Sequence, residues 1–488
     1  MSHIKMLSSS SHIRHSHLSL QPAPAWIAIL GFVFFSALCI LAGAGSIMRL
    51  AFPVGAFVVG VFLYRRYPIL YVGFTWWLWF LTPLVRRLID YRSGWVEPNP
   101  VLLAPFLATL VTLATFLRYI PKSYRQGGFP FVLSCTGVFY AFVVGLVNSM
   151  LGGTLNSVIQ ELGEVYTPSS VIVDTLQWIT PILFSFHLFV NWQYYPKYRR
   201  NIQRNFFWAV LVTGGYGVLQ YLVAPEWDRF WLTNVIKIGI TSFGLPEPLG
   251  IRVFSTMNSP GTFAAVMMSG LLLLLSGKGT LRFFATAVGA LALLLTLVRT
   301  VWGGFTVGIL VFITSLKANL QMRLIVTILI VGICVFPLTT VEPFSQVINA
   351  RLQTLSNVQE DGSYQERAET YNRVLGVALF EPLGNGLGHP AFDSTVIDML
   401  LAMGWLGAIP YVGGLVLLLF QLRQCIERRF DSFMSAANSI SLAMLAQLGF
   451  GNGLIELGGL MFWGFLGIVL AGHKYYQHQR TLQTSETS

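Results

Sequence analysis

Charged side chains are scarce in this sequence. Aspartate, glutamate, lysine and arginine together make up 10% of its 488 residues, whereas hydrophobic residues make up 54%, and the mean hydropathy is +0.65. No polar stretch between the apolar runs is long enough to form a core of its own, so the composition excludes a sizeable separate soluble domain. The chain is therefore predicted to be an integral membrane protein with many spans.

Cysteine is rare as well, and acidic metal-binding motifs are absent. Cys39, Cys135 and Cys334 fall in apolar runs, and Cys425, the fourth cysteine, falls in a short basic loop. This is neither the spacing of a disulfide framework nor that of a metal site, and no Asp-x-Asp pair is present. The sequence thus predicts no bound metal and no cofactor. Paired Pro- or Gly-broken spans in the two halves are also missing, which counts against an inverted-repeat transporter.

Apolar runs dominate what is present. Windows of about twenty apolar residues predict an all-α fold with about fourteen membrane helices (twelve to fourteen). The short second run and the pair within 282–316 are the least clearly bounded, and 396–421 is long enough for a short helix followed by a span. The predicted spans lie near residues 26–45, 48–63, 68–84, 99–117, 129–149, 172–192, 206–224, 262–277, 282–298, 301–316, 324–341, 396–421, 433–450 and 454–472.

The charges predict how these spans are oriented. With both ends of the chain in the cytoplasm, 20 of the 31 lysines and arginines fall in inner segments, whereas 17 of the 20 acids fall outside or at outer span ends. This satisfies the positive-inside rule. The basic net charge of +11 is therefore explained by topology and not by binding of nucleic acid.

The same reading divides the chain into three parts. Residues 1–25 are interpreted as a polar, disordered cytoplasmic tail, 26–473 as a single transmembrane domain, and 474–488 as a second cytoplasmic tail. The first apolar run is too long for a signal-peptide core, so we expect an uncleaved anchor.

Three long segments, 150–171, 225–261 and 342–395, are predicted to face the outside, which places the functional residues there. In the second of these, Ser259 followed by Pro260 predicts a helix N-terminus, where unpaired N–H groups favour anions. Arg252 lies just upstream and is able to bind the same anion; the alternative is that it only contacts lipid headgroups.

The third outer segment contains a predicted amphipathic helix. Ser363 and Glu366 form a capping box, and the helix should run to about Phe380 and end before Pro382. An apolar stripe of Val374, Leu375, Ala378 and Leu379 indicates a helix that lies on or in the outer membrane surface.

Arginines at this outer face are candidates for binding phosphate. Glu369 and Arg373 stand four residues apart and form either a surface ion pair or part of a site. Arg367 has no acid four residues before it, and a guanidinium binds phosphate oxygens bidentately while it stays charged. Arg299 lies between two apolar runs, where burying a charge costs about 2.5–3.5 kcal/mol, and such residues usually line a polar cavity. The alternative for Arg299 is that it reaches out to the headgroups.

A glycine-rich loop, PLGNGLGHPAFDS, follows the amphipathic helix. Because it follows a helix and precedes no Rossmann unit, a dinucleotide site is excluded. Gly384, Gly386 and Gly388 are predicted to let the backbone approach a substrate or another span closely. His389 and Asp393 are the titratable groups nearest to this loop, and either is a candidate general base.

These segments together resemble a known family. The stretch SYQERAETYNRVLGVALFEPLGNGLG, followed by FDSTVIDMLLAMGWLGAIPYV, resembles the signature region of the O-antigen polymerase and O-antigen ligase superfamily. The segments RVFSTMNSPGTFA and TLVRTVWGG, which contain Arg252 and Arg299, are similar to its two upstream elements. The resemblance covers roughly residues 205–425.

The resemblance implies a metal-independent, multi-span glycosyltransferase of the bacterial cytoplasmic membrane. Its donor would be a polyprenyl-pyrophosphate-linked glycan used at the outer face, and a flippase and a chain-length regulator would be partners besides membrane lipid. By the same resemblance, Arg252, Arg299 and Arg367 match positions expected to hold the donor phosphates. Arg373 and Gly384 fit an Arg-x10-Gly spacing of polymerase outer loops.

Two branches of the superfamily and one other class remain as alternatives. Ligases carry a His-Asn pair shortly before the Gly-x-x-Gly that begins here at Gly404, but Asp393 and Ser394 stand in that place and His389 lies four positions earlier. This favours a polymerase, in which arginines stabilise the departing pyrophosphate and Asp393 or His389 deprotonates the acceptor hydroxyl. A ligase, which transfers a finished glycan to a lipid or protein, and a polysaccharide or lipid-carrier transporter are the alternatives.

Overall fold

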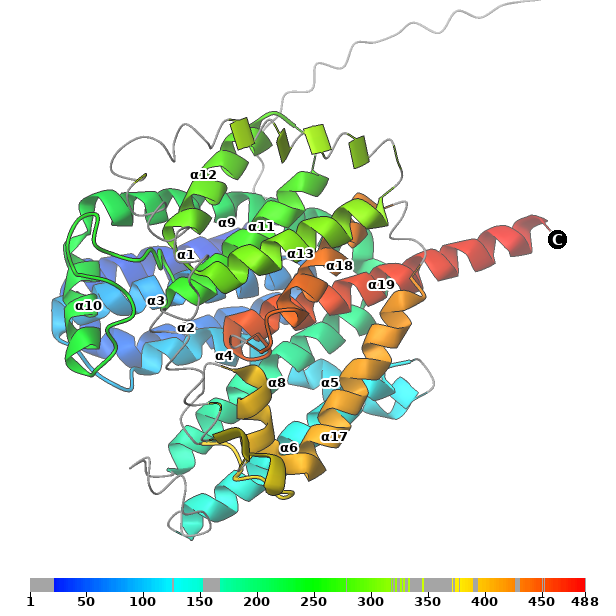
Figure 1. Ribbon diagram of the computed structural model, residues 1–488, viewed down its shortest axis with the longest axis horizontal. Coiled ribbons are helices and arrows are strands. Elements are labelled where there is room, and N and C mark those ends of the chain that lie inside the picture. The colour runs from blue at the N-terminus through cyan, green and yellow to red at the C-terminus, as the bar shows by residue number, and fades with distance from the viewer. Residues whose placement is uncertain are drawn as a thin grey trace, which may run out of the picture.

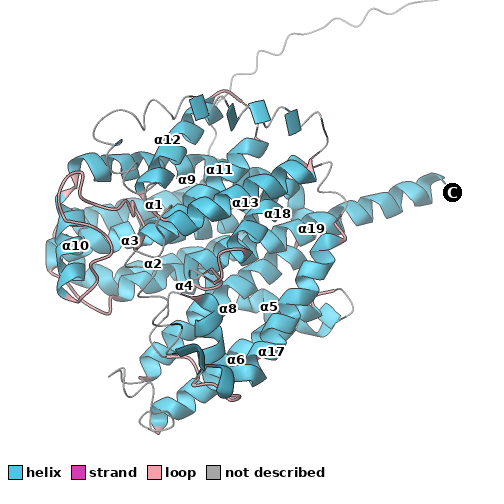
Figure 2. Cartoon of the chain, in the orientation of Figure 1, coloured by secondary structure: helices cyan, strands magenta, loops and turns pink. Residues whose placement is uncertain are grey.

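The structure is a computed structural model that describes residues 22–487 apart from several gaps. The gaps are 125–126, 152–166, 278, 317, 319–320, 323–324, 327, 330–331, 334–344, 346–370, 372–373, 377, 389–393, 426–430, 450 and 452. Within the described residues the chain forms helices joined by turns and loops, and it contains no β-strand (Figure 2). The predicted all-α fold is confirmed for this part of the chain.

Nine helical segments in the described part of the chain are long and apolar enough to cross a membrane, by length and composition. Two of these segments are composite: η1 (Pro100–Leu102), α4 (Leu103–Leu110) and α5 (Leu113–Ser123) form one, and η3 (Trp192–Tyr194) joined to α9 (Tyr195–Val223) forms the other. The remaining segments are α1 (Ala23–Leu41), α2 (Gly45–Arg66), α3 (Pro68–Ser93), α6 (Phe129–Met150), α8 (Pro168–Val190), α17 (Thr395–Arg423) and α19 (Glu456–Thr487).

Shorter helices occupy further predicted spans. They are α11 (Pro260–Ser276), α12 (Leu281–Leu295), α13 (Arg299–Ser315) and α18 (Ser432–Leu445). Most of the predicted span 324–341 lies outside the described residues, so a polytopic membrane protein is confirmed while the number fourteen stays a prediction. A short helix that the hydrophobic pattern did not indicate, α10 (Glu226–Lys237), lies in the predicted outer segment 225–261.

Several helices are longer than their apolar windows. α9 begins eleven residues before the predicted span, α3 continues to Ser93, and α19 continues to Thr487 through the predicted C-terminal tail. The hydrophobic window detects only the apolar part of a helix, which is the part that can lie in the hydrocarbon core of the membrane. Backbone hydrogen bonding continues wherever the flanking residues tolerate a helix, as the charged residues in these extensions do.

The bundle has a buried centre and a loosely held edge. In the most apolar window of α19, 89% of the residues are buried, whereas in that of α1 only 17% are buried. α19 packs along α8, and α17 packs along α6. Figure 1 shows α10 at one end of the molecule, with the C-terminal end of α19 projecting from the opposite end.

Two local features place the functional segments. Ser259 caps α11 as predicted, because its side chain accepts a hydrogen bond from the Thr262 N–H and Pro260 takes the first helical position. α17 is broken at Gly404, whose φ of 54° lies in the left-handed region. This break fits the alternative in which 396–421 comprises a short helix followed by a span.

Candidate functional site

Arg252 is held against the connection between α12 and α13. Its Nη1 donates to the carbonyl of Ser242 at 2.7 Å, and its Nε and Nη2 donate to the carbonyls of Thr296 and Leu297, each at 3.4 Å. The backbone reinforces this contact, since the N–H of Val253 donates to the carbonyl of Leu295 at 3.2 Å. The predicted outer segment 225–261 is thus joined to the residues just before Arg299.

Arg299 is the first residue of α13 and is partly buried. The turn before it is tight: Leu297 has a φ of 56°, and the side-chain oxygen of Thr296 accepts a hydrogen bond from the Val298 N–H at 3.3 Å. A cation at a helix N-terminus adds to the positive end of the helix dipole. This arrangement opposes helix stability and raises the affinity of the turn for an anion.

Of the four predicted phosphate-binding arginines, Arg252 therefore contacts the turn that leads into Arg299. The guanidinium of Arg252 contacts the carbonyl of Leu297, which is two residues before Arg299. Arg367 and Arg373, the other two, lie outside the described residues, as do the candidate bases His389 and Asp393.

A buried ion pair that the sequence analysis missed supports the segment that contains Arg252. Arg87 on α3 and Asp228 on α10 lie 3.3 Å apart between Nη1 and Oδ1, and both side chains are fully buried. Arg87 also donates to the carbonyl of Ser255, and its guanidinium carbon lies 4.8 Å from the ring centre of Phe254. The backbone that follows Arg252 is therefore fixed by α3.

Gln220 on α9 completes this support. Its Oε1 accepts hydrogen bonds from the N–H groups of Phe254 and Ser255, at 3.0 and 2.7 Å. Its Nε2 donates to Asp228 Oδ2 at 2.8 Å, and Tyr216 O–H donates to the same oxygen at 2.7 Å. One carboxamide thus joins the α10 carboxylate to the backbone two and three residues after Arg252.

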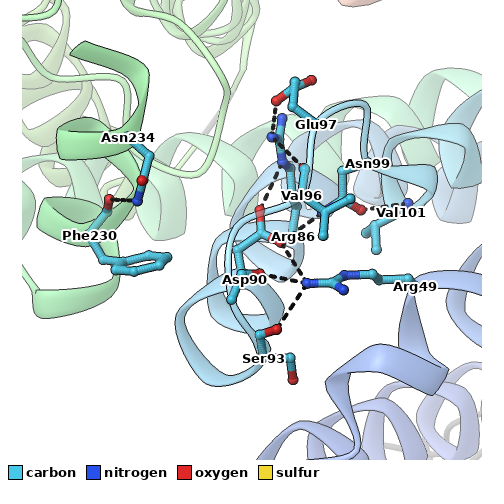
Figure 3. Close-up of polar contacts among 11 residues, drawn as sticks. Arg49, Arg86, Asp90, Ser93, Val96, Glu97, Asn99, Val101, Phe230 and Asn234 are labelled. Atoms are coloured by element: carbon cyan, nitrogen blue, oxygen red, sulfur yellow. Dashed lines mark hydrogen bonds and ion pairs between the residues drawn. The ribbon is translucent and has the colours of Figure 1, made fainter. Parts of the chain in front are cut away.

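A second charged network lies at the same end of α3 (Figure 3). Asp90, fully buried, accepts from Arg86 Nε at 3.2 Å and from Asn99 Nδ2 at 2.8 Å, and it lies 3.6 Å from Arg49 Nη2 on α2. Arg86 pairs with Glu97 as well. These residues tie α2, α3 and the loop before η1 together, and the sequence signal for them was only a pair of arginines after an apolar run.

The backbone of the glycine loop packs closely against neighbouring spans. Gly384 has a φ of 68°, and a Cβ on it would lie 2.3 Å from the backbone nitrogen of Gly404 at the break in α17. The N–H groups of Asn385 and Gly386 donate to the carbonyls of Leu401 and Ala402, at 2.7 and 2.9 Å. The prediction that these glycines allow close backbone approach to another span is confirmed.

The same loop is wedged against α6 and α8. A Cβ on Gly386 would lie 2.0 Å from the backbone nitrogen of Gly145 on α6, and the Leu387 N–H donates to the carbonyl of Ala141 at 3.0 Å. The Gly388 N–H donates to Asp174 Oδ2 on α8 at 2.9 Å. The chain is therefore firmly anchored at the residue directly before His389.

The described part of the predicted amphipathic helix is helical, but its predicted apolar stripe is divided between the protein core and the surface, so a helix lying on the membrane surface stays a prediction. Residues 371, 374–376 and 378–380 are helical, and the helix ends at Phe380. Val374 and Ala378 are buried against the core, whereas Leu379 is exposed. The predicted capping residues Ser363 and Glu366 lie outside the described residues.

Comparison with known proteins gives one match. Residues 284–412 match the family model described as O-antigen ligase. This segment is about a quarter of the chain, and it contains Arg299, the glycine loop and the break at Gly404, but not Arg252. No curated protein and no solved structure matches the chain.

Proposed function

We propose that this chain, which belongs to the O-antigen polymerase and ligase superfamily through its residues 284–412, is a membrane glycosyltransferase that polymerises oligosaccharide repeats. The donor is a repeat linked to a polyprenyl pyrophosphate, and the growing chain is an O-antigen or exopolysaccharide. The reaction takes place at the outer face of a bacterial cytoplasmic membrane.

The observation that supports this proposal most strongly is the meeting of Arg252 with the turn that begins α13 at Arg299. Two guanidinium-bearing segments and a helix N-terminus come together there, on a chain otherwise poor in charge. Such a turn suits a diphosphate, because negative charge builds up on the pyrophosphate as its bond to the sugar breaks. Arg367 and Arg373 are proposed to complete the same site.

The proposed step is a displacement at the anomeric carbon of the donor. An acceptor hydroxyl oxygen forms the new glycosidic bond, and the bond from the anomeric carbon to the pyrophosphate oxygen breaks. The electron pair leaves with the pyrophosphate, and the hydroxyl proton passes to Asp393 or His389. The anchoring of the loop by Asp174 at Gly388 fixes the start of the segment that carries both candidate bases.

Ligase-type transfer is the second candidate, and the match of residues 284–412 to the O-antigen ligase family favours it. The two candidates differ in their acceptor. Purified protein incubated with a carrier-linked repeat as the sole substrate should produce a ladder of longer carrier-linked glycans if it is a polymerase. Product that forms only when a second lipid or protein acceptor is added would assign the chain to ligase-type transfer.

The arginine site is tested by Arg252→Ala and Arg299→Ala in the same assay. Each should lower the rate of product formation by about a hundredfold, as does loss of one group that stabilises developing negative charge. Arg229→Ala is the matched control, since Arg229 also donates to a loop carbonyl, that of Pro246 at 3.1 Å, but has no hydrogen bond to the α12–α13 turn among the described residues. Normal rates in both test variants would refute the site.

A further inference from the structure

An apolar groove of about 820 Å³ runs between α1 and α3, and residues of α9 and α10 line its two ends. Its lining along α3 extends from Leu70 to Arg92, which is roughly 33 Å at 1.5 Å per helical residue. The hydrocarbon core of a bilayer is about 30 Å thick. The groove is therefore long enough to cross the hydrocarbon layer.

One wall of the groove is α1, which has few buried residues. α1 contributes a stripe at helical spacing that includes Ile29, Val33 and Ala37, yet α1 is the least buried of the spans in the described part of the chain. Ser36, on the same stripe, donates to the carbonyl of Phe32 in its own helix at 2.8 Å, so it offers no donor to the groove. The middle of the groove thus suits hydrocarbon chains.

The end of the groove near the start of α3 is polar and positively charged. Asn201, Arg204 and Asn205 line it from α9. Asn205 Nδ2 donates to Asn201 Oδ1 at 2.8 Å, and the absence of a Cβ on Gly73 makes room for this pair. Among the described residues, the Arg204 guanidinium has no hydrogen-bond or ion-pair partner. A cation and two carboxamides therefore face an apolar channel.

The opposite end has a different charge. Arg92 lines it, but so does Glu226, which accepts a hydrogen bond from Tyr91 O–H. A carboxylate at this end repels an anionic headgroup, whereas no acidic side chain lines the end at Arg204. The two ends are thus unequal, and the Arg204 end is complementary to an anion.

We propose that this groove is a binding site for one anionic glycerophospholipid. Its phosphate lies on the Arg204 guanidinium, which binds phosphate bidentately, and its ester carbonyls face the Asn201 amide. Its acyl chains follow Phe74 and Trp77 between α1 and α3 and join α1 to the bundle. By the predicted orientation, the lipid belongs to the cytoplasmic leaflet, which supplies anionic lipid.

The polar, Arg204 end of this groove is separate from the proposed transfer site. It lies near the start of α3, whereas Arg87, which supports the Arg252 segment, lies near the end of α3. A carrier whose pyrophosphate binds at Arg252 would have its headgroup in the opposite leaflet. The groove therefore does not need the carrier as its occupant, and the test below distinguishes the two.

Native mass spectrometry of the purified full-length chain, with phosphatidylglycerol added, tests the proposal. One lipid should bind the wild type, and Arg204→Ala should weaken binding about tenfold, as expected for loss of charge-assisted hydrogen bonds. Arg200→Ala is the matched control, because Arg200 is exposed on the same helix but does not line the groove.

A second pair of variants tests the channel itself. Ala37→Trp should fill the groove and abolish binding of the lipid, whereas Leu30→Trp, on a face of α1 that does not line the groove, should leave it unchanged. The proposal would be overturned if Arg204→Ala bound the lipid as well as Arg200→Ala does, and Ala37→Trp as well as Leu30→Trp does. Equal binding of phosphatidylcholine, or displacement of phosphatidylglycerol by an equimolar polyprenyl phosphate, would also overturn it.

Discussion

The guanidinium of Arg87 and the carboxylate of Asp228 lie 3.3 Å apart, and neither side chain is exposed to solvent. Asp228 also accepts from Gln220 and Tyr216, and Arg87 donates to the carbonyl of Ser255. A buried ion pair need not add net stability, but removing one partner leaves the other charge buried and uncompensated. The pair therefore makes the conformation of the Arg252 segment depend on α3 and α10.

The first prediction concerns this ion pair. Asp228→Asn should lower the free energy of unfolding by about 3–5 kcal/mol, because Arg87 is left as a buried, unpaired charge. Arg87→Met combined with Asp228→Asn should cost less than the sum of the two single changes. Chemical unfolding of the detergent-solubilised protein measures all three values. Additive costs in free energy of unfolding would show that the two charges are not coupled. As the control, Arg200→Ala should unfold like the wild type.

The second prediction concerns the shape of the cation at residue 299. Arg299→Lys keeps the positive charge but loses the planar pair of donors that a diphosphate would engage. We expect it to recover only part of the activity that Arg299→Ala loses, with glycan chains shorter than in the wild type. Chain-length profiles from cells with matched protein levels measure this effect. Wild-type profiles in Arg299→Lys would mean that charge alone is sufficient.

The third prediction concerns the glycine loop. Gly386→Ala would place a Cβ 2.0 Å from the backbone nitrogen of Gly145, at a φ of 77°. Strain and overpacking together should cost about 3 kcal/mol or more. Gly376→Ala is the control, since nothing lies within 4 Å of its Cβ position and alanine favours a helix. Thermal unfolding should separate the two variants clearly, and similar melting temperatures would contradict the close packing.

How much of this could be predicted from the sequence depends on how local each signal is. The Ser259–Pro260 helix start was predictable because capping is decided by neighbouring residues. The all-α membrane fold was predictable because each apolar run indicates its own membrane span, independently of the rest of the chain. The glycine loop was predictable as a place of close backbone approach, since glycines at this density relieve steric exclusion.

Other features were not predictable because they arise between distant segments. Arg87 and Ser255 are 168 residues apart in the chain, and nothing in either neighbourhood specifies the other. α10 is too short and too polar for a hydrophobic window to detect. The partners of the glycine loop on α6 and α8 likewise follow from packing, so the sequence indicated that the backbone approaches something without indicating which span.

The last prediction concerns Asp174, whose Oδ2 accepts the Gly388 N–H at 2.9 Å. Asp174→Ala removes this acceptor and should loosen the segment that begins at His389. Because that segment is proposed to carry the general base, the change should lower the turnover rate more than it changes substrate affinity. Asp174→Asn keeps a carbonyl oxygen able to accept the same N–H, so it should retain most of the activity. Steady-state rates with a carrier-linked repeat measure the split between kcat and KM. Equal losses in the two variants would show that the charge of Asp174, and not the hydrogen bond to Gly388, is what the reaction requires.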